Sequence, residues 1–306
     1  MRTVFLGTSE FAAGLLTDLC SADDGAFRPA LVLTRPDRPA GRGRKLSSPP
    51  VAPAARELGL ELAQPESVND EQARASIAAA RPQAVIVCAF GALIKQPLLD
   101  EYELLNVHPS LLPRWRGAAP IERALMAGEE QTGVSIMRVT EGLDSGPLYM
   151  AQTEPIAPQD TYGSLAPRLQ RLGARLLLEA LRQLQRGEQL PCAEQDDAMA
   201  TYAEKIAPAD RLLDPSRPAA ELERVVRALT PHIGARLALA DGGWLGVRQA
   251  ALLDVQAAGP EGLYAQGERL LFGCSPGTLE LQAVQPPGKR PMGAAAFLRG
   301  HELAQA

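Results

Sequence analysis

Short apolar runs rich in β-branched residues alternate with amphipathic stretches through the first part of the chain. The runs TVFLG (3–7), PALVLT (29–34) and AVIVCAF (84–90) are typical of buried strands, whereas residues 10–20 and 67–80 have the spacing of helices. Strands that alternate with helices form βαβ units around a parallel sheet. The pattern therefore predicts an α/β domain with a Rossmann-like open parallel sheet.

The same alternation continues beyond the third predicted strand. LNVHPSL (105–111) is predicted as a strand that ends in a loop, APIERALMAG (119–128) as a helix and TGVSIMRVT (132–140) as another strand. Residues 164–187 have the apolar stripe of a long amphipathic helix. We therefore expect a first domain over residues 1–187.

The last third of the chain has a different pattern. Residues 188–206 are polar and weakly patterned, as in a linker. A helix is predicted over 221–230, and residues 235–253 have the pattern of a hairpin that turns at Asp241 to Gly243, followed by short strands between Gly and Pro residues. We expect a small β-barrel, similar to an OB-fold, over residues 207–306.

A chain of 306 residues is long enough for two domains of ordinary size. Its composition, 46% hydrophobic and 22% charged residues, is that of a globular protein. The net charge of −5 argues against a protein that binds nucleic acid over its whole surface. Residues 35–45, RPDRPAGRGRK, nevertheless hold five basic residues and one Asp. An anionic partner could bind at this basic segment.

Several classes of protein are disfavoured by the sequence. The N-terminal residues enter a strand-like run without the pattern of a secretory signal, and no apolar stretch reaches membrane-spanning length. The four cysteines are far apart and form no CxxC pair, so neither a zinc site nor a disulfide framework is indicated (Cys20, Cys88, Cys192 and Cys274). We expect a cytoplasmic protein without a bound metal or a membrane partner.

The first glycine turn does not have the features of a dinucleotide site. Gly7 follows a predicted strand and precedes a helix, but LGTSEFAAG lacks the GxGxxG spacing and no acidic residue clearly ends the second strand. The pattern favours a tight strand-to-helix turn. In open α/β sheets, ligands bind at the carboxyl ends of the strands, and Asn106 and His108 lie at such an end.

Asn106 and His108 are candidates for chemistry at a carbonyl group. Alternation along a strand directs residues i and i+2 to the same face, and an amide and an imidazole can together stabilise an oxygen that becomes negative. Asp144, between Gly142 and Gly146, could hold the imidazole or receive a proton. On spacing alone, an Asn-x-His pair is more often a capped strand end than a catalytic pair, and Asp144 could equally be an Asx-turn residue.

Two longer stretches add a family resemblance. NVHPSLLPRWRGAAPI (106–121) and TGVSIMRVTEGLDSGPLY (132–149) resemble the folate-dependent formyltransferases, whose active site is an Asn, a His and an Asp. Asn106, His108 and Asp144 match these positions. FLGTSEFAA, TRPDRPAGRGRKLSSPPV and TYAEKI resemble the members of that family that act on a charged tRNA. The resemblance extends from about residue 2 to about residue 207, and it is weak beyond.

This resemblance implies a reaction and its substrates. 10-Formyltetrahydrofolate would donate a formyl group to the α-amine of methionine on initiator methionyl-tRNA. Asn106 and protonated His108 would stabilise the oxyanion, and Asp144 would orient His108 and help to manage the proton that leaves the amine. The segment SLLP would contact the folate (Ser110, Leu111, Leu112 and Pro113).

The resemblance also implies that the basic loop contacts the tRNA through four residues, namely Arg38, Arg42, Arg44 and Lys45. The C-terminal domain would add a second surface with Arg248, Lys289 and Arg290. We expect a monomer. Two alternatives stay open: a formyltransferase that acts on a small amine, and a tRNA-binding protein of the same fold without catalysis.

Overall fold

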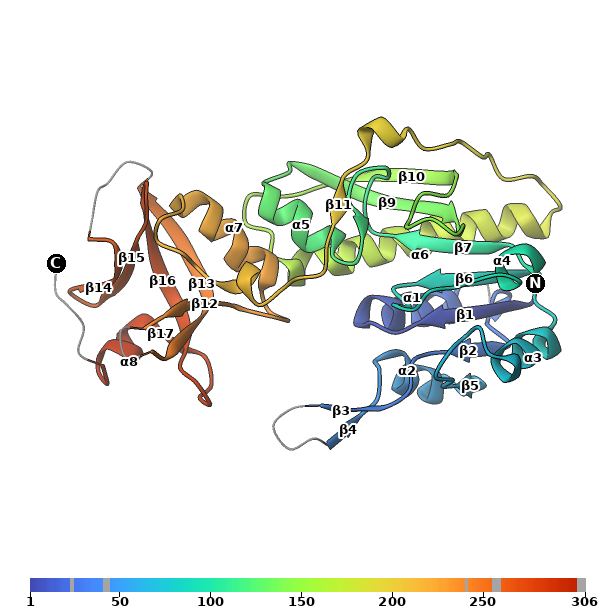
Figure 1. Ribbon diagram of the computed structural model, residues 1–306, viewed down its shortest axis with the longest axis horizontal. Helices are drawn as coiled ribbons and strands as arrows, with labels where there is room; N and C mark the ends of the chain where they lie inside the picture. Colours follow the sequence, from blue (N-terminus) through green and yellow to red (C-terminus); the bar gives the residue numbers. More distant parts are fainter. Residues whose placement is uncertain (23–24, 41–44, 240–241, 255–259, 302–306) are drawn as a thin grey trace. The chain divides into compact units, whose positions relative to one another are not determined.

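The computed structural model describes residues 1–22, 25–40, 45–239, 242–254 and 260–301. The chain forms two compact units whose segments interleave along the sequence (Figure 1). Unit 1 consists of Met1–Pro120, Gln131–Pro155 and Ala166–Ala203. Unit 2 consists of Ile121–Glu130, Ile156–Leu165 and Glu204–Ala306.

Unit 1 is built on a seven-stranded sheet (Figure 1). In spatial order its strands are β10 (Leu148–Pro155), β9 (Gln131–Arg138), β7 (Leu104–His108), β6 (Ala84–Cys88), β1 (Thr3–Gly7), β2 (Leu31–Leu33) and β5 (Leu62–Ala63). The strands from β7 to β5 run parallel, whereas β9 and β10 are antiparallel to their neighbours. The predicted Rossmann-like open sheet is confirmed, with an antiparallel extension beyond β7.

The helices that begin in unit 1 start at residues whose side chains cap them or at prolines. They are α1 (Glu10–Ser21), α2 (Val51–Glu57), α3 (Glu71–Ala80), α4 (Leu98–Glu101) and α5 (Pro120–Ala127). The Asp70 side chain accepts a hydrogen bond from the Ala73 N–H at 2.7 Å. Because this cap satisfies a free amide of the first turn, α3 begins at Glu71 and not at residue 67 as predicted.

Strand β7 is buried along its whole length and carries two of the candidate residues. Leu104 belongs to an apolar cluster with Val85 and Val87 of β6. Asn106 and His108 continue the same face of the strand, because side chains alternate. On the opposite face of the strand, Val107 lies against helix α6 (Tyr162–Gln185). The contact is close, because a Cβ added at Gly173 of α6 would lie 2.8 Å from the Cγ1 atom of Val107.

Unit 2 contains an antiparallel sheet that curls into a half-barrel (Figure 1). In spatial order its strands are β12 (Ala235–Ala238), β13 (Trp244–Asp254), β16 (Thr278–Gln285), β15 (Arg269–Gly273) and β14 (Gly262–Gln266), and β17 (Met292–Gly293) pairs with β16. The pairing of β13 with β16 shifts register at three places. Bulges of this kind increase the twist, which accounts for the curl. The predicted class of small antiparallel barrel is confirmed.

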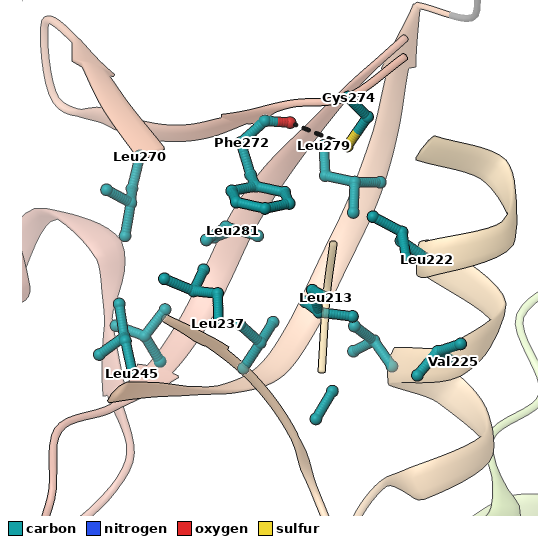
Figure 2. Packing of buried hydrophobic residues seen from close by; sticks show 14 of the residues in the cluster. Leu213, Leu222, Val225, Leu237, Leu245, Leu270, Phe272, Cys274, Leu279 and Leu281 are labelled. Atoms are coloured by element: carbon teal, nitrogen blue, oxygen red, sulfur yellow. Dashed lines mark hydrogen bonds between the residues drawn. The ribbon is translucent and has the colours of Figure 1, made fainter. Parts of the chain in front are cut away.

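The core of unit 2 lies between the curled sheet and two helices, α7 (Ala219–Leu229) and α8 (Ala294–Leu298). Figure 2 shows Leu222 and Val225 of α7 beside leucines of the sheet and Phe272 of β15. Ten of the buried side chains are at most 1% exposed: Ala219, Leu222, Leu229, Leu237, Leu245, Val247, Leu270, Leu279, Leu281 and Val284. Removing this apolar surface from water is the main stabilising contribution to the unit.

Short elements complete the fold. They are β3 (Arg38–Ala40), β4 (Lys45–Ser47), β8 (Arg116–Gly117), β11 (Tyr202–Ala203) and the 3-10 turns Asp197–Met199 and Ala209–Arg211. None of the helices in the described ranges combines the length and the apolar composition that crossing a bilayer requires.

Candidate active site

Asn106 and His108 lie at the carboxyl end of β7, where they are 9% and 4% exposed. Both side chains reach Asp144, which comes from the loop after β9. The Asn106 Nδ2 atom donates to Asp144 Oδ1 at 3.4 Å, and His108 Nδ1 lies 3.6 Å from Asp144 Oδ2. The structure therefore brings together the three residues that the sequence analysis selected for catalysis.

The loop that carries Asp144 runs close to neighbouring backbone. The backbone N–H of Gly117 donates to Asp144 Oδ2 at 2.8 Å, which fixes one carboxylate oxygen. At Gly146 a Cβ would lie 2.0 Å from the Arg138 carbonyl oxygen, so only glycine fits there. Asp144 itself has a φ of +46°, in the left-handed region that few residues with side chains adopt.

The second nitrogen of His108 is held by the loop after β7. Nε2 lies 2.9 Å from the Trp115 carbonyl oxygen. A carbonyl can only accept, so Nε2 carries a hydrogen and donates it. Trp115 has a φ of +61°, and its N–H donates to Thr201 Oγ1 at 2.9 Å. An uncommon backbone conformation in a bulky residue persists only where its surroundings fix it, as these two hydrogen bonds do.

The segment 195–203, within the predicted linker, lies along this loop in unit 1. Strand β11 pairs in parallel with β8. The Thr201 carbonyl accepts from the Arg116 N–H at 2.9 Å, and the Ala203 carbonyl accepts from Ala118 and Ala119 at 2.8 and 3.1 Å. The segment is therefore part of the framework of the candidate active site.

Two polar side chains near the site were not selected from the sequence. Gln195 donates from Nε2 to the backbone carbonyls of Asp144 and Gly146, and Arg116 donates to Gln195 Oε1. Arg116 lies in the stretch that carries the family resemblance, but Gln195 lies in a polar segment without a pattern. Only the folded chain brings Gln195 to the Asp144 loop.

The segment predicted to contact the folate is fixed by hydrogen bonds of its own. Ser110 is fully buried, and its Oγ donates to the Arg114 carbonyl at 2.6 Å. Ser135 Oγ donates to the Ser110 carbonyl at 2.8 Å and accepts from the Leu112 N–H at 3.2 Å. Leu112 is buried, whereas Leu111 and Pro113 are half-buried. The segment thus has a defined shape beside β9.

The basic loop is described at its base only. Strands β3 and β4 form a two-stranded hairpin, and Arg38 Nη2 lies 2.6 Å from Glu66 Oε2, with side chains 62% and 75% exposed. Arg42 and Arg44 lie outside the described residues, and of Lys45 only the backbone in β4 is described. At the base of the loop, Asp37 accepts hydrogen bonds from Gln64 and Ser48, and these bonds lower the pKa of its carboxyl group.

In the described part of the chain, no group of three or more His, Cys, Asp or Glu side chains is arranged as metal ligands would be. The four cysteines are free, and Cys192 is exposed. Burial raises the pKa of the Cys88 thiol, and it raises the pKa of the Cys274 thiol to about 11. These two thiols are therefore protonated and unreactive near neutral pH.

Comparison with known families gives a match over most of the chain. Residues 1–181 match the formyl transferase family, and residues 205–302 match the formyl transferase C-terminal domain. The methionyl-tRNA formyltransferase of Halorhodospira halophila is 44% identical, over 99% of this chain and 97% of that protein. The protein of the same name from Pseudomonas paraeruginosa is 45% identical, over 95% of this chain and 93% of its own.

Solved structures have the same fold at low sequence identity. HypX from Aquifex aeolicus in complex with tetrahydrofolic acid aligns with 100% of this chain and 49% of its own, with a TM-score of 0.66 and 18% identity. An N-formyltransferase from Helicobacter canadensis in complex with folinic acid and dTDP-3-aminofucose aligns with 92% of this chain and 98% of its own, with a TM-score of 0.66 and 13% identity. With the family match over more than half of its length and relatives above 40% identity, the chain belongs to the formyl transferase family.

Proposed function

We propose that this protein transfers the formyl group of 10-formyltetrahydrofolate to the α-amino group of methionine on initiator methionyl-tRNA. The product would be the formylated initiator tRNA of translation. The observation that carries the proposal is that Asn106, His108 and Asp144 lie together at the end of β7. The methionyl-tRNA formyltransferases to which the chain is similar align over nearly its full length, which supports the same reaction.

The reaction joins the amine nitrogen to the formyl carbon and breaks the bond between that carbon and N10 of the folate. As the neutral amine attacks, the formyl oxygen becomes negative and needs hydrogen-bond donors. Asn106 Nδ2 supplies one. Its bond to Asp144 is 3.4 Å long, near the limit for a hydrogen bond, so a substrate oxygen can replace the carboxylate as acceptor.

His108 supplies the second donor in its imidazolium form. Its Nε2–H is engaged by the Trp115 carbonyl, which fixes the plane of the ring. Nδ1 lies 3.6 Å from the Asp144 carboxylate, too far for a hydrogen bond, and is therefore free to donate to a substrate oxygen.

Asp144 is the group that receives a proton from the amine as the new C–N bond forms. Its carboxylate contacts both oxyanion donors, so an amine that attacks the same formyl carbon passes close to it. The proton must finally reach N10 of the departing folate, and a carboxylate beside the reacting atoms can relay it.

The folate is assigned to the segment from Ser110 to Pro113. Two hydrogen bonds with Ser135 hold this segment beside β9, and Leu111 is half-buried there. A preformed segment with apolar side chains and backbone groups suits the flat pterin ring of a folate. We assign catalysis to a domain over residues 1–187 and tRNA binding to residues 207–306, which the two family matches support. Residues 188–206 connect these two domains in the chain, and their segment 195–203 also contributes to the framework of the site.

The tRNA is assigned to the basic loop, through Arg38, Arg42, Arg44 and Lys45, and to Lys289 and Arg290 of unit 2, which are exposed. Arg248 is a weaker candidate, since it already donates to Gln285 Oε1 at 2.8 and 2.6 Å. The exposed Arg38–Glu66 pair can be exchanged for a phosphate at little cost.

Because charged tRNA is a cytoplasmic substrate, we propose a cytoplasmic enzyme, and we propose a monomer.

The test is transfer of radiolabelled formyl from 10-formyltetrahydrofolate to four acceptors: methionyl initiator tRNA, methionyl elongator tRNA, free methionine and a dTDP-amino sugar. Label on the initiator species alone supports the proposal. Label on the amino sugar would assign the chain to the small-amine enzymes instead. Binding of tRNA without any transfer would indicate a protein that keeps the fold without the activity.

A further inference from the structure

All the hydrogen-bonding groups of the Gln195 side-chain amide are in use. Nε2 has two hydrogens, and it donates to the carbonyl of Asp144 at 2.9 Å and to that of Gly146 at 2.6 Å. Oε1 accepts from Arg116 Nε at 3.1 Å and from Arg116 Nη2 at 2.9 Å. One side chain therefore connects a buried guanidinium to the backbone of the loop that carries Asp144.

The Asp144 loop depends on contacts of this kind. Asp144 has a φ of +46°, which costs free energy for any residue with a side chain and persists only where neighbours fix it. Gly117 and Asn106 hold the carboxylate. The two carbonyls that accept from Gln195 lie on either side of Ser145, so the amide fixes the turn of the backbone from which the carboxylate projects.

Arg116 determines which way the Gln195 amide faces. Its guanidinium is 4% exposed and also donates to Asp197 Oδ1 at 2.7 Å, whose side chain is 81% exposed. A guanidinium only donates, so it selects the oxygen end of the amide and turns Nε2 toward the loop. The wrong amide orientation would direct Oε1 at two carbonyl oxygens and repel them.

We propose that Gln195 is a positioning residue for Asp144: it holds the backbone of the Asp144 loop so that the carboxylate stays between Asn106 and His108. The inference rests on the proposed formyl transfer. It assigns a part in catalysis to a segment that the sequence indicates only as a linker. A displacement of about 1 Å in a catalytic group can cost about 10²-fold in rate, so loss of Gln195 should be seen in kcat.

The substitution Gln195→Glu separates this role from a merely structural one. A glutamate keeps the shape of the side chain and improves its contact with Arg116, so a residue needed only to satisfy Arg116 would tolerate it. The carboxylate cannot donate to the carbonyls of Asp144 and Gly146, and its oxygens repel them. We expect kcat to fall between 10-fold and 100-fold, roughly the range for a displaced catalytic group, with an unchanged KM for the folate.

The matched control is Asp197→Asn, which changes the other partner of the same guanidinium and leaves the Asp144 loop untouched. It should keep kcat within about two-fold, as surface substitutions usually do. Gln195→Ala should lower kcat as Gln195→Glu does. If Gln195→Glu keeps the kcat of the unsubstituted enzyme, the proposal is wrong, whatever Gln195→Ala does to folding.

A second measurement does not depend on activity. Backbone hydrogen exchange over residues 141–147 should become faster in Gln195→Glu than in Asp197→Asn, with equal midpoints of thermal unfolding. Unchanged exchange in the loop would also overturn the proposal. If the unsubstituted protein transfers no formyl group to methionyl-tRNA, the proposed function fails, and the exchange result still decides whether Gln195 holds the loop.

Discussion

At the scale of single residues, Asp144 is the centre of the candidate active site because one carboxylate contacts both other candidates. Its Oδ1 accepts from Asn106, and its Oδ2 lies beside His108 Nδ1. The carboxylate is 18% exposed, so the attraction to a charged imidazole is screened by water much less than at the surface. His108 and Asp144 should therefore act as a unit.

This coupling predicts a non-additive pair of substitutions. Either His108→Ala or Asp144→Ala should lower kcat by about 10²-fold to 10⁴-fold, the usual contribution of proton transfer by a positioned group. The double variant should be little worse than the poorer single one, because either loss already disables the pair. Single-turnover formyl transfer to methionyl-tRNA measures all three variants. Rate losses that multiply would show that the two residues act independently.

The sequence carries the information for part of this site only. Asn106 and His108 could be placed on one face because strand alternation is a local rule. The approach of Asp144 also follows from its position after a strand. The contact from Gln195 could not be predicted, because it joins residues that are 51 positions apart and depends on how the segment after α6 returns to the loop.

At the scale of elements, strand β9 supports the segment to which we assign the folate, through a close approach at Gly133. A Cβ there would lie 2.2 Å from the Gln152 carbonyl of β10 and 2.5 Å from Leu111 Cδ2. The backbone of the neighbouring strand cannot move aside without breaking ladder hydrogen bonds. Gly133 thus sets both the spacing of β9 from β10 and the position of Leu111.

The substitution Gly133→Ala should therefore affect stability and folate binding together. We expect a loss of about 1–3 kcal/mol in the free energy of unfolding, as for other overpacked sites, and a higher KM for 10-formyltetrahydrofolate. Chemical denaturation and steady-state kinetics measure the two effects. Gly300→Ala is the control, since a Cβ there would be 3.8 Å from its nearest neighbour. Equal behaviour of the two variants would contradict this role for Gly133.

Elements with a regular pattern of apolar residues could be predicted from the sequence, whereas an exposed edge strand and a short helix could not. Strands β1 and β6 and helix α6 follow the pattern of the sequence closely. Strand β10, LYMAQTEP, was not predicted, because it is an edge strand with several exposed residues and little alternation. Helix α2, VAPAARE, was missed as well, because it is short, contains Pro53 and follows two prolines.

At the scale of the whole molecule, charge sets the conditions under which a polyanion can bind. The net charge of −5 repels tRNA at a distance, so association depends on local basic groups such as those of residues 35–45. Arg38, at the base of that loop, is described with an exposed acidic partner. Phosphate contacts made by such groups weaken as salt screens them.

The proposed tRNA contact therefore predicts a dependence on salt that is specific to one substrate. kcat/KM for methionyl-tRNA should fall linearly with salt on logarithmic axes, with a slope of roughly −0.7 to −0.9 for each phosphate contacted, because bound cations are released from the tRNA. KM for the folate, which binds without a polyanionic backbone, should change little over the same range.

Arg38→Ala tests whether the base of the basic loop takes part in this contact. It should lower kcat/KM for tRNA at low salt and reduce the steepness of the slope by about 1, as the loss of one phosphate contact would. The matched control is Arg186→Ala, which breaks another exposed Arg–Glu pair, with Glu188, outside the basic loop. If the two variants have the slope of the unsubstituted enzyme, Arg38 makes no phosphate contact. In that case, the assignment of tRNA binding would rest on Arg42, Arg44 and Lys45, to be tested by the same measurement.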